Sequence, residues 1–187
     1  IMDKEVEIVV QQIADSQIEI GAYALILKER KGDRNLVIII GTAEAQSITL
    51  KIAGIQSQRP LTHDLLKTVI DSLNARVQKV LIYKSEKGIY FSYVFIEKEN
   101  LETLQIDSRT SDAIALALRC NVPIYIYESI LERDKIQITK EAKPQSTIKE
   151  QTTLESLEEA LNKAVEEENY ELASVLRDKI EKIKSQQ

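Results

Sequence analysis

The chain has 187 residues, of which 43% are apolar, which is enough for one medium-sized domain with an appendage or for two small domains. Its net charge of −5 argues against broad, sequence-blind binding to nucleic acid through a basic surface. The acidity is concentrated in the last quarter of the sequence. Residues 1–140 contain 18 lysines and arginines against 19 aspartates and glutamates, whereas residues 141–187 contain 7 against 11.

The cysteine content and the hydropathy of the sequence predict the cellular compartment of the protein. The single cysteine, Cys120, cannot form an internal disulfide and excludes a metal centre built from cysteines, as is typical of a reducing environment. No stretch resembles a signal peptide or approaches the length of a membrane span. We therefore expect a cytoplasmic location and no association with a membrane.

Over residues 1–139 the pattern predicts an α/β (α+β) domain with a mixed β-sheet and about three main helices. A turn at 85–88 predicts that the strands on either side of it form a hairpin. Strands are expected where apolar residues alternate or form short runs, at 5–10, 19–28, 36–40, 77–83, 89–96, 104–107, 123–127 and 135–139.

Two helices are predicted between the third and fourth strands, and a short helical turn at 129–131. Gly41 and Thr42 open the first helix, in which Ala45, Ile48, Ile52 and Ile55 recur at helical spacing. Thr62 is the expected N-cap of the second helix. The predicted buried side of that helix consists of Leu65, Leu66, Val69, Ile70 and Leu73.

The stretch from Leu104 to Cys120 predicts a strand that leads into a buried helix. Asp107 closes the strand, residues 108–110 form a short polar turn, and Ser111 is the expected N-cap of the helix. Asp112 lies in the first helical turn, where the helix dipole favours a negative charge. Two carboxylates and Arg109 therefore meet where a strand ends and a helix begins, which favours a binding or catalytic site.

The sequence predicts that residues 140–187 form a part separate from the first domain. Residues 140–152 are poor in apolar side chains and predict a flexible linker. Residues 153–187 contain two short amphipathic segments separated by a brief polar break, which predict an antiparallel α-hairpin. A hairpin of about 30 residues has a small core, so we expect it to dock on a second copy or on a partner protein. A homodimer or a higher homo-oligomer is therefore expected.

Residues 41–127 resemble the bifunctional nuclease domain, a family credited with both RNase and DNase activity. The matching motifs are Gly41-Thr-Ala-Glu-Ala, Arg59-Pro-Leu-Thr-His-Asp-Leu, Asp107-Ser-Arg-Thr-Ser-Asp-Ala-Ile-Ala-Leu-Ala-Leu-Arg and Val122-Pro-Ile. They occur in the family's order and at similar spacing. One departure is Thr110, where the family usually has proline, and it is expected to loosen the turn.

The segment from Leu154 to Ile183 is similar to the UVR motif, which the excision-repair proteins UvrB and UvrC share with some stress-protease adaptors. Its signature is Ala164-Val-Glu-Glu-Glu-Asn-Tyr-Glu-Leu-Ala, followed by Leu176-Arg-Asp-Lys-Ile. In those relatives the hairpin mediates contact between proteins. The resemblance therefore implies a partner protein for this segment.

Hydrolysis of a phosphodiester needs an activated attacking oxygen, neutralisation of the phosphate charge and assistance to the leaving oxygen. The chain offers one histidine and several carboxylates and arginines in the matching motifs. The candidate catalytic residues are His63, Asp64, Asp107 and Asp112. The candidate substrate-binding residues are Arg59, Arg109 and Ser111, and the candidate ligands of Mg²⁺ or Mn²⁺ are Glu44, Asp107 and Asp112.

Each candidate also has a purely structural explanation. Ser111 is well placed to cap a helix, and Asp64 and Asp112 complement helix dipoles. Asp107 and Arg109 could form a structural ion pair that holds the turn between strand and helix. The strand tyrosines are expected to pack on the sheet rather than to stack on bases; they are Tyr83, Tyr90, Tyr93, Tyr125 and Tyr127.

Two functions remain open at this point. The first is a nuclease that hydrolyses phosphodiester bonds of RNA or DNA with the help of a metal ion, with the hairpin recruiting a partner protein. The second is a non-catalytic adaptor in DNA repair or stress proteostasis. A metal-assisted nuclease requires at least two of the carboxylates of Asp64, Asp107, Asp112 and Glu44 within shared reach of a metal, whereas an adaptor can leave them scattered.

Overall fold

The structure is a computed structural model that describes residues 3–16 and 21–136, together with seven separate helical positions between 161 and 184. The chain divides into two compact units, of which the first contains Ile1–Ala14 and Tyr23–Gln137 and the second contains Asp15–Ala22 and Ile138–Gln187. The predicted linker and α-hairpin lie outside the described residues, apart from those seven positions. No helix of the described part is long and apolar enough to cross a membrane.

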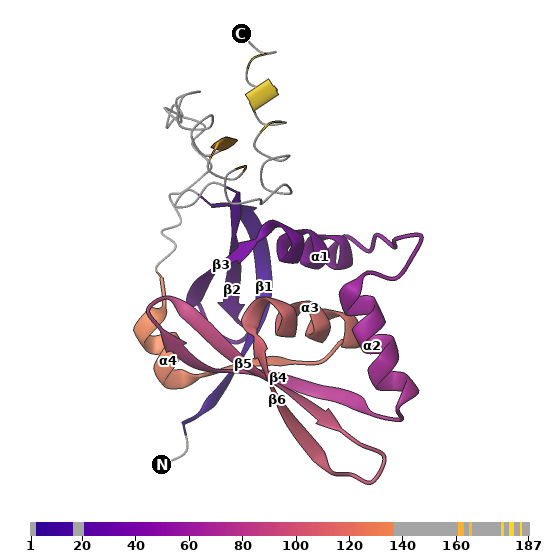
Figure 1. Ribbon diagram of the computed structural model, residues 1–187. Helices are drawn as coiled ribbons and strands as arrows, with labels where there is room; N and C mark the ends of the chain where they lie inside the picture. Colours follow the sequence, from indigo (N-terminus) through magenta and orange to yellow (C-terminus); the bar gives the residue numbers. More distant parts are fainter. Residues whose placement is uncertain are drawn as a thin grey trace. The chain divides into compact units, whose positions relative to one another are not determined.

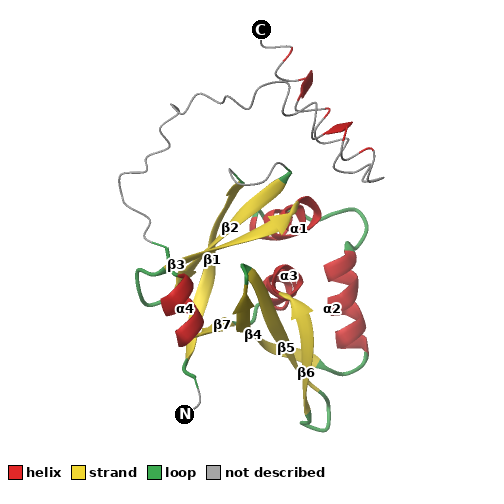
Figure 2. Ribbon diagram, turned by 60° about the vertical axis from the view of Figure 1, so that its left-hand side comes forward, coloured by secondary structure: helices red, strands yellow, loops and turns green. Residues whose placement is uncertain are grey.

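The first unit is built on one sheet of seven strands in the order β3-β2-β1-β7-β4-β5-β6 (Figures 1 and 2). Strand β4 pairs with β7 in parallel, whereas β1 with β7, β4 with β5 and β5 with β6 are antiparallel. The predicted mixed α+β fold and the hairpin of β4 and β5 are therefore confirmed. The elements are β1 (Glu5–Asp15), β2 (Ala22–Glu29), β3 (Asn35–Gly41), α1 (Thr42–Ile52), α2 (Thr62–Ser72), β4 (Arg76–Glu86), β5 (Ile89–Glu97), β6 (Thr103–Arg109), α3 (Thr110–Cys120), β7 (Ile124–Tyr127) and α4 (Glu128–Asp134).

Helix α3 is the central helix of the fold and contacts α1, α2, β4 and β5 (Figure 1). Ala113, Ala115 and Ala117 are fully buried, and their small side chains let the helix backbone approach its neighbours closely. The helix ends at Asn121, which adopts the left-handed conformation with φ 54° that terminates many helices. On β5 the buried residues alternate with half-buried ones, so one face of the strand meets α3.

The junction of β6 and α3 differs from the prediction of a turn at 108–110 and of a cap at Ser111. Strand β6 continues to Arg109 and α3 begins at Thr110 without a loop. The reason is that the Thr110 hydroxyl is buried and lies 2.7 Å from the Ser92 hydroxyl in a hydrogen bond. That contact holds Thr110 in the core, so Arg109 takes the N-cap position and no side chain caps the helix.

Helix α2 also departs from the prediction, because most of its expected buried side is exposed. Thr62 is the first residue of the helix rather than its N-cap, which is Leu61. Of the predicted buried residues only Ile70 is buried, at 8% exposed, because polar side chains on α2 make much of its contact with α3. The exposed residues are Leu65, Leu66, Val69 and Leu73 on α2, and likewise Ile52 and Ile55 at the end of the first predicted helix.

The ends of the domain agree in part with the prediction. The described part of the second strand begins at Ala22, and the predicted helical turn at 129–131 lies inside the longer helix α4. Ile136 forms an isolated bridge with Asn35 instead of opening a strand, and residues 137–139 lie outside the described residues.

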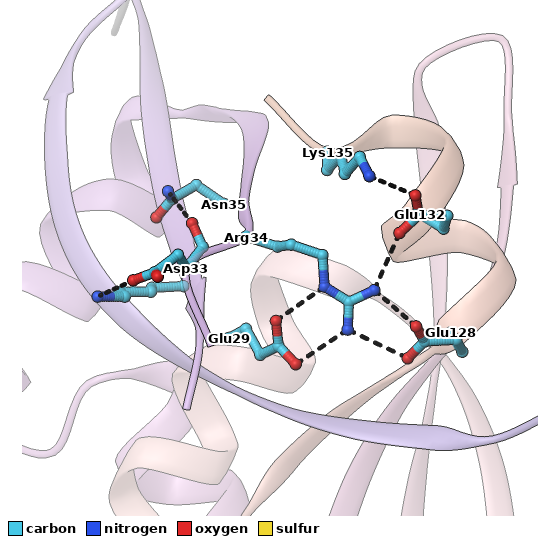
Figure 3. Close-up of polar contacts among 8 residues, drawn as sticks. Glu29, Asp33, Arg34, Asn35, Glu128, Glu132 and Lys135 are labelled. Carbon is cyan, nitrogen blue, oxygen red and sulfur yellow. Dashed lines mark hydrogen bonds and ion pairs between the residues drawn. The ribbon is translucent and has the colours of Figure 1, made fainter. Parts of the chain in front are cut away.

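An arginine beside β3 joins that edge of the sheet to α4 (Figure 3). The Arg34 guanidinium donates two hydrogen bonds to Glu29, at 2.8 and 2.9 Å, and others to Glu128 and Glu132 of α4, at 2.6 and 3.1 Å. The side chain is only 23% exposed, and its pKa is raised, chiefly by the hydrogen bonds to Glu29 and then to Glu128. Arg34 thus holds together elements that lie far apart in the sequence.

We predict that Arg34→Met lowers the free energy of unfolding by about 1.5–3 kcal/mol, because it removes several charge-assisted hydrogen bonds at once. Arg30→Met is the matched control, since Arg30 makes one 2.9 Å ion pair with Glu7 and is 57% exposed. We expect the control to change stability by less than about 1 kcal/mol. Urea unfolding followed by circular dichroism compares the two, and equal losses would contradict the assignment.

Candidate active site

A cleft of about 810 Å³ opens between α1, α2, α3, β5 and β6. One part of its wall is aliphatic and includes Leu50, Leu66, Ile70, Ile96, Ile106 and Leu116. The other part is polar and includes Glu44, Ser47, His63, Asp107, Arg109 and Asp112. Five residues predicted from the sequence therefore line one cleft, together with Ser47, which the sequence analysis did not select.

His63 is held from both sides of its imidazole ring. Its Nδ1 lies 2.9 Å from the Ser47 hydroxyl on α1, and its Nε2 lies 3.1 Å from a carboxylate oxygen of Asp112 on α3. The carboxylate can only accept, so in the neutral imidazole the Nε2–H donates to Asp112 and the lone pair of Nδ1 accepts from Ser47. The side chain of His63 is 12% exposed, so the ring is fixed in one orientation at the wall of the cleft.

Arg109 extends this line of polar contacts across the mouth of the cleft. Its Nε donates to the second oxygen of Asp112 at 2.6 Å, and its Nη2 lies 2.8 Å from Glu44. Gly41 leaves room for the Glu44 carboxylate, because a Cβ at position 41 would lie 2.6 Å from it. The guanidinium side chain remains 69% exposed and can meet a ligand in the cleft.

A second ion pair braces the same helices deeper in the domain. The Arg119 side chain is 4% exposed, and its Nε donates to Asp64 at 2.5 Å. Its other nitrogens donate to the backbone carbonyls of Ala115 and Ser47, at 3.0 and 3.3 Å. Asp64 also accepts the backbone N–H of Leu61 at 2.9 Å. Asp64 is therefore bonded on both oxygens and does not line the cleft.

The electrostatics of the two aspartates follow from these contacts. Burial by itself would raise the pKa of Asp112, but the hydrogen bonds from Arg109 and His63 outweigh it and hold the pKa below its usual value. Burial likewise opposes the shift at Asp64, and the hydrogen bonds from the Leu61 amide and Arg119 lower its pKa. Both carboxyls are therefore ionised at neutral pH.

Three of the predicted residues, Asp64, Arg59 and Ser111, do not line the cleft. Asp107 lines the cleft, but its carboxylate accepts a 3.0 Å hydrogen bond from the hydroxyl of Tyr83, whose ring stacks on Tyr93 at 3.7 Å. Arg59 is exposed in the loop between α1 and α2, and neither it nor Ser111 lines the cleft.

The three predicted metal ligands contact other side chains in the structure. Glu44 and Asp112 both bind Arg109, whereas Asp107 is bonded to Tyr83. Within the described ranges, no three side chains of Asp, Glu, His or Cys are placed to hold a metal ion. A Mg²⁺ or Mn²⁺ shared by Glu44, Asp107 and Asp112 stays a prediction.

Ser47 and Arg119 are the residues that sequence reasoning missed. Arg119 had a signal, because it is a charged residue in an apolar helix, seven positions after Asp112 and therefore on nearly the same face. Ser47 had little signal in the sequence, because a single serine within a helix forms no recognisable pattern. Its partner His63 is 16 positions away and meets it only when α1 and α2 both pack against α3.

The comparisons with known proteins define the class. The family model of the bifunctional nuclease domain matches residues 25–139, and that of the UvrB/uvrC motif matches residues 151–186. The chain therefore belongs to the bifunctional nuclease domain family, which confirms the resemblance seen in its motifs.

Relatives occur in bacteria and plants. An uncharacterized protein of Mycobacterium tuberculosis is 35% identical over 123 residues, which are 66% of this chain and 73% of the relative. Bifunctional nuclease 1 of Arabidopsis thaliana is 28% identical over 179 residues, or 84% of this chain and 55% of the relative. Bifunctional nuclease 2 of Oryza sativa subsp. japonica is 32% identical over 124 residues, which are 64% of this chain and 38% of the relative. The chain thus spans about half or less of these two named nucleases.

The lowered pKa values predict how stability depends on pH. A carboxyl with a pKa lower in the folded state than in the unfolded state stabilises the fold above its unfolded pKa, about 3.9 for Asp, and this contribution is lost as the pH falls through the folded pKa. We expect the free energy of unfolding of the wild type to fall steeply below about pH 4. The free energy of unfolding of Asp112→Asn should fall less over that pH range, because the titrating carboxyl has been removed.

Asp33→Asn is the control, because the carboxylate of Asp33 is fully exposed and lies 3.9 Å from its lysine partner. It should keep the wild-type dependence on pH. Urea unfolding at a series of pH values from 7 to 3 measures the effect, and equal curves for Asp112→Asn and the wild type would contradict the assignment.

Proposed function

We propose that this chain is a nuclease that hydrolyses phosphodiester bonds of RNA, DNA or both, with His63 as the group that transfers protons. Membership of the bifunctional nuclease domain family supports the class of reaction. The observation that carries the proposal is the position of His63, which is bonded on both ring nitrogens at the wall of a large cleft. An imidazole oriented by a carboxylate is suited to general acid–base catalysis.

Each polar residue of the cleft has a role in this proposal. Asp112 accepts the Nε2–H of His63, so the lone pair of Nδ1, on the Ser47 side of the ring, takes a proton from the attacking oxygen and returns it to the leaving oxygen. Arg109 contacts the phosphate through the exposed part of its guanidinium, which can fork onto two oxygens. Glu44 holds that guanidinium from the side of α1.

Assistance by Mg²⁺ or Mn²⁺ was expected from the sequence, and the proposed roles of His63 and Arg109 do not depend on it. The C-terminal segment enters the proposal only through its motif. Because residues 151–186 match the UvrB/uvrC motif, we propose that this segment binds a partner protein. We also propose that the chain acts as a homo-oligomer in the cytoplasm.

The test is cleavage of labelled single-stranded and double-stranded RNA and DNA by the purified full chain, with Mg²⁺, with Mn²⁺ and with EDTA. We predict that His63→Gln lowers the rate by about 10²–10⁴-fold, since general acid–base catalysis is lost. Asp112→Asn should also lower it, whereas Asp71→Asn, a control on the exposed side of α2 whose carboxylate pairs with Lys67, should not.

Folding of each variant is checked by circular dichroism. Activity that persists in folded His63→Gln would contradict the assignment of the proton-transfer group. A folded wild type without activity on any substrate and in any metal condition would overturn the proposal, and the non-catalytic adaptor would then be the better account.

A further inference from the structure

Ser47 differs from two hydroxyl residues of the neighbouring helix α2 in its hydrogen-bond partner. On α2, Thr68 and Ser72 donate to the carbonyls four residues earlier, those of Asp64 and Thr68, at 2.9 and 2.7 Å. Such bonding back to the helix is the usual partner of a serine within a helix. Ser47 on α1 instead bonds to His63 of another helix, 16 positions away in the sequence. Its hydroxyl is therefore directed at the imidazole.

The direction of the hydrogen bond follows from the rest of the chain of contacts. Asp112 receives the Nε2–H of His63, so the Nδ1 lone pair is the acceptor for the Ser47 O–H. A hydroxyl that donates to an imidazole, which is in turn oriented by a carboxylate, is the arrangement of an activated serine nucleophile. The three side chains come from α1, α2 and α3 and line one cleft.

The backbone of Ser47 is fixed as well. Its carbonyl accepts a 3.3 Å hydrogen bond from Arg119, whose guanidinium is paired with Asp64, the residue that follows His63. Arg119 thus holds the backbone of Ser47 to the residue next to His63, while the side chains of Ser47 and His63 bond directly. These contacts limit how far the hydroxyl can move from the imidazole, which is what a nucleophile and its base require.

We infer that Ser47 is the nucleophile of this cleft and attacks a phosphorus centre through its hydroxyl oxygen. This inference rests on the proposed function for the class of its substrate. In the first step the bond between Ser47 Oγ and phosphorus forms, the bond to the leaving oxygen breaks, and the Ser47 proton passes through His63 Nδ1 to that oxygen. In the second step water attacks the phosphoserine ester, His63 takes a proton from the water, and that proton returns to Ser47 Oγ.

The test uses a fluorophosphonate probe on the full chain, because such a probe reports a nucleophilic serine without a nucleic acid. Attack by Ser47 forms a bond from Oγ to phosphorus, releases fluoride and transfers the proton to His63. Peptide mass spectrometry should find the adduct on Ser47 of the wild type. It should be absent in Ser47→Ala, reduced at least about tenfold in His63→Gln, and unchanged in Ser72→Ala, whose hydroxyl bonds only within α2.

Cleavage assays on the same proteins separate this inference from the proposed function. If the chain is a nuclease, Ser47→Ala should lower cleavage by more than about 10²-fold while Ser72→Ala remains at the wild-type rate. Labelling of Ser47 in a wild type that cleaves no nucleic acid would support the nucleophile and refute the nuclease. A folded wild type without an adduct on Ser47, or a Ser47→Ala variant that cleaves within twofold of the wild-type rate, would overturn the inference.

Discussion

Arg119 places a positive charge where almost no solvent reaches it, and a buried guanidinium is tolerated only when its donors are paired. Its partners are the carboxylate of Asp64 on α2 and the backbone carbonyls of Ser47 on α1 and Ala115 on α3. The three helices are consequently held at the spacing that satisfies this one side chain. The contact between His63 and Asp112 lies beside it, because His63 precedes Asp64 and Asp112 is seven residues before Arg119.

The charge balance of the site limits how strongly it can attract a negatively charged substrate. The cleft is lined by three carboxylates, those of Glu44, Asp107 and Asp112, and by one guanidinium, that of Arg109. Such a site attracts a polyanion less than a basic cleft does, which agrees with the acidic net charge of the chain. Substrate recognition must therefore depend on shape, on the aliphatic wall and on the exposed guanidinium of Arg109 more than on long-range attraction.

Much of this arrangement could be predicted from the sequence because it is local. The motif around residues 107–112 brought Arg109 and Asp112 together, and the helix starts identified His63 and Glu44. Two errors have a common origin in tertiary packing, which local patterns do not contain. Thr110 displaced the predicted cap by bonding to Ser92 in the core, and α2 directs polar residues toward α3. Ser47 was missed for the same reason.

The central claim is that Asp112 fixes His63 with Nδ1 directed at Ser47, and the chain offers an unusually clean probe of it because His63 is its only histidine. Long-range ¹H–¹⁵N NMR of the imidazole, at a pH where the ring is neutral, reports which nitrogen carries the proton. We predict that Nε2 is protonated in the wild type, that Asp112→Asn changes this tautomer balance, and that Asp71→Asn does not. Protonation of Nδ1 in the wild type, or the same tautomer balance in Asp112→Asn as in the wild type, would contradict the account.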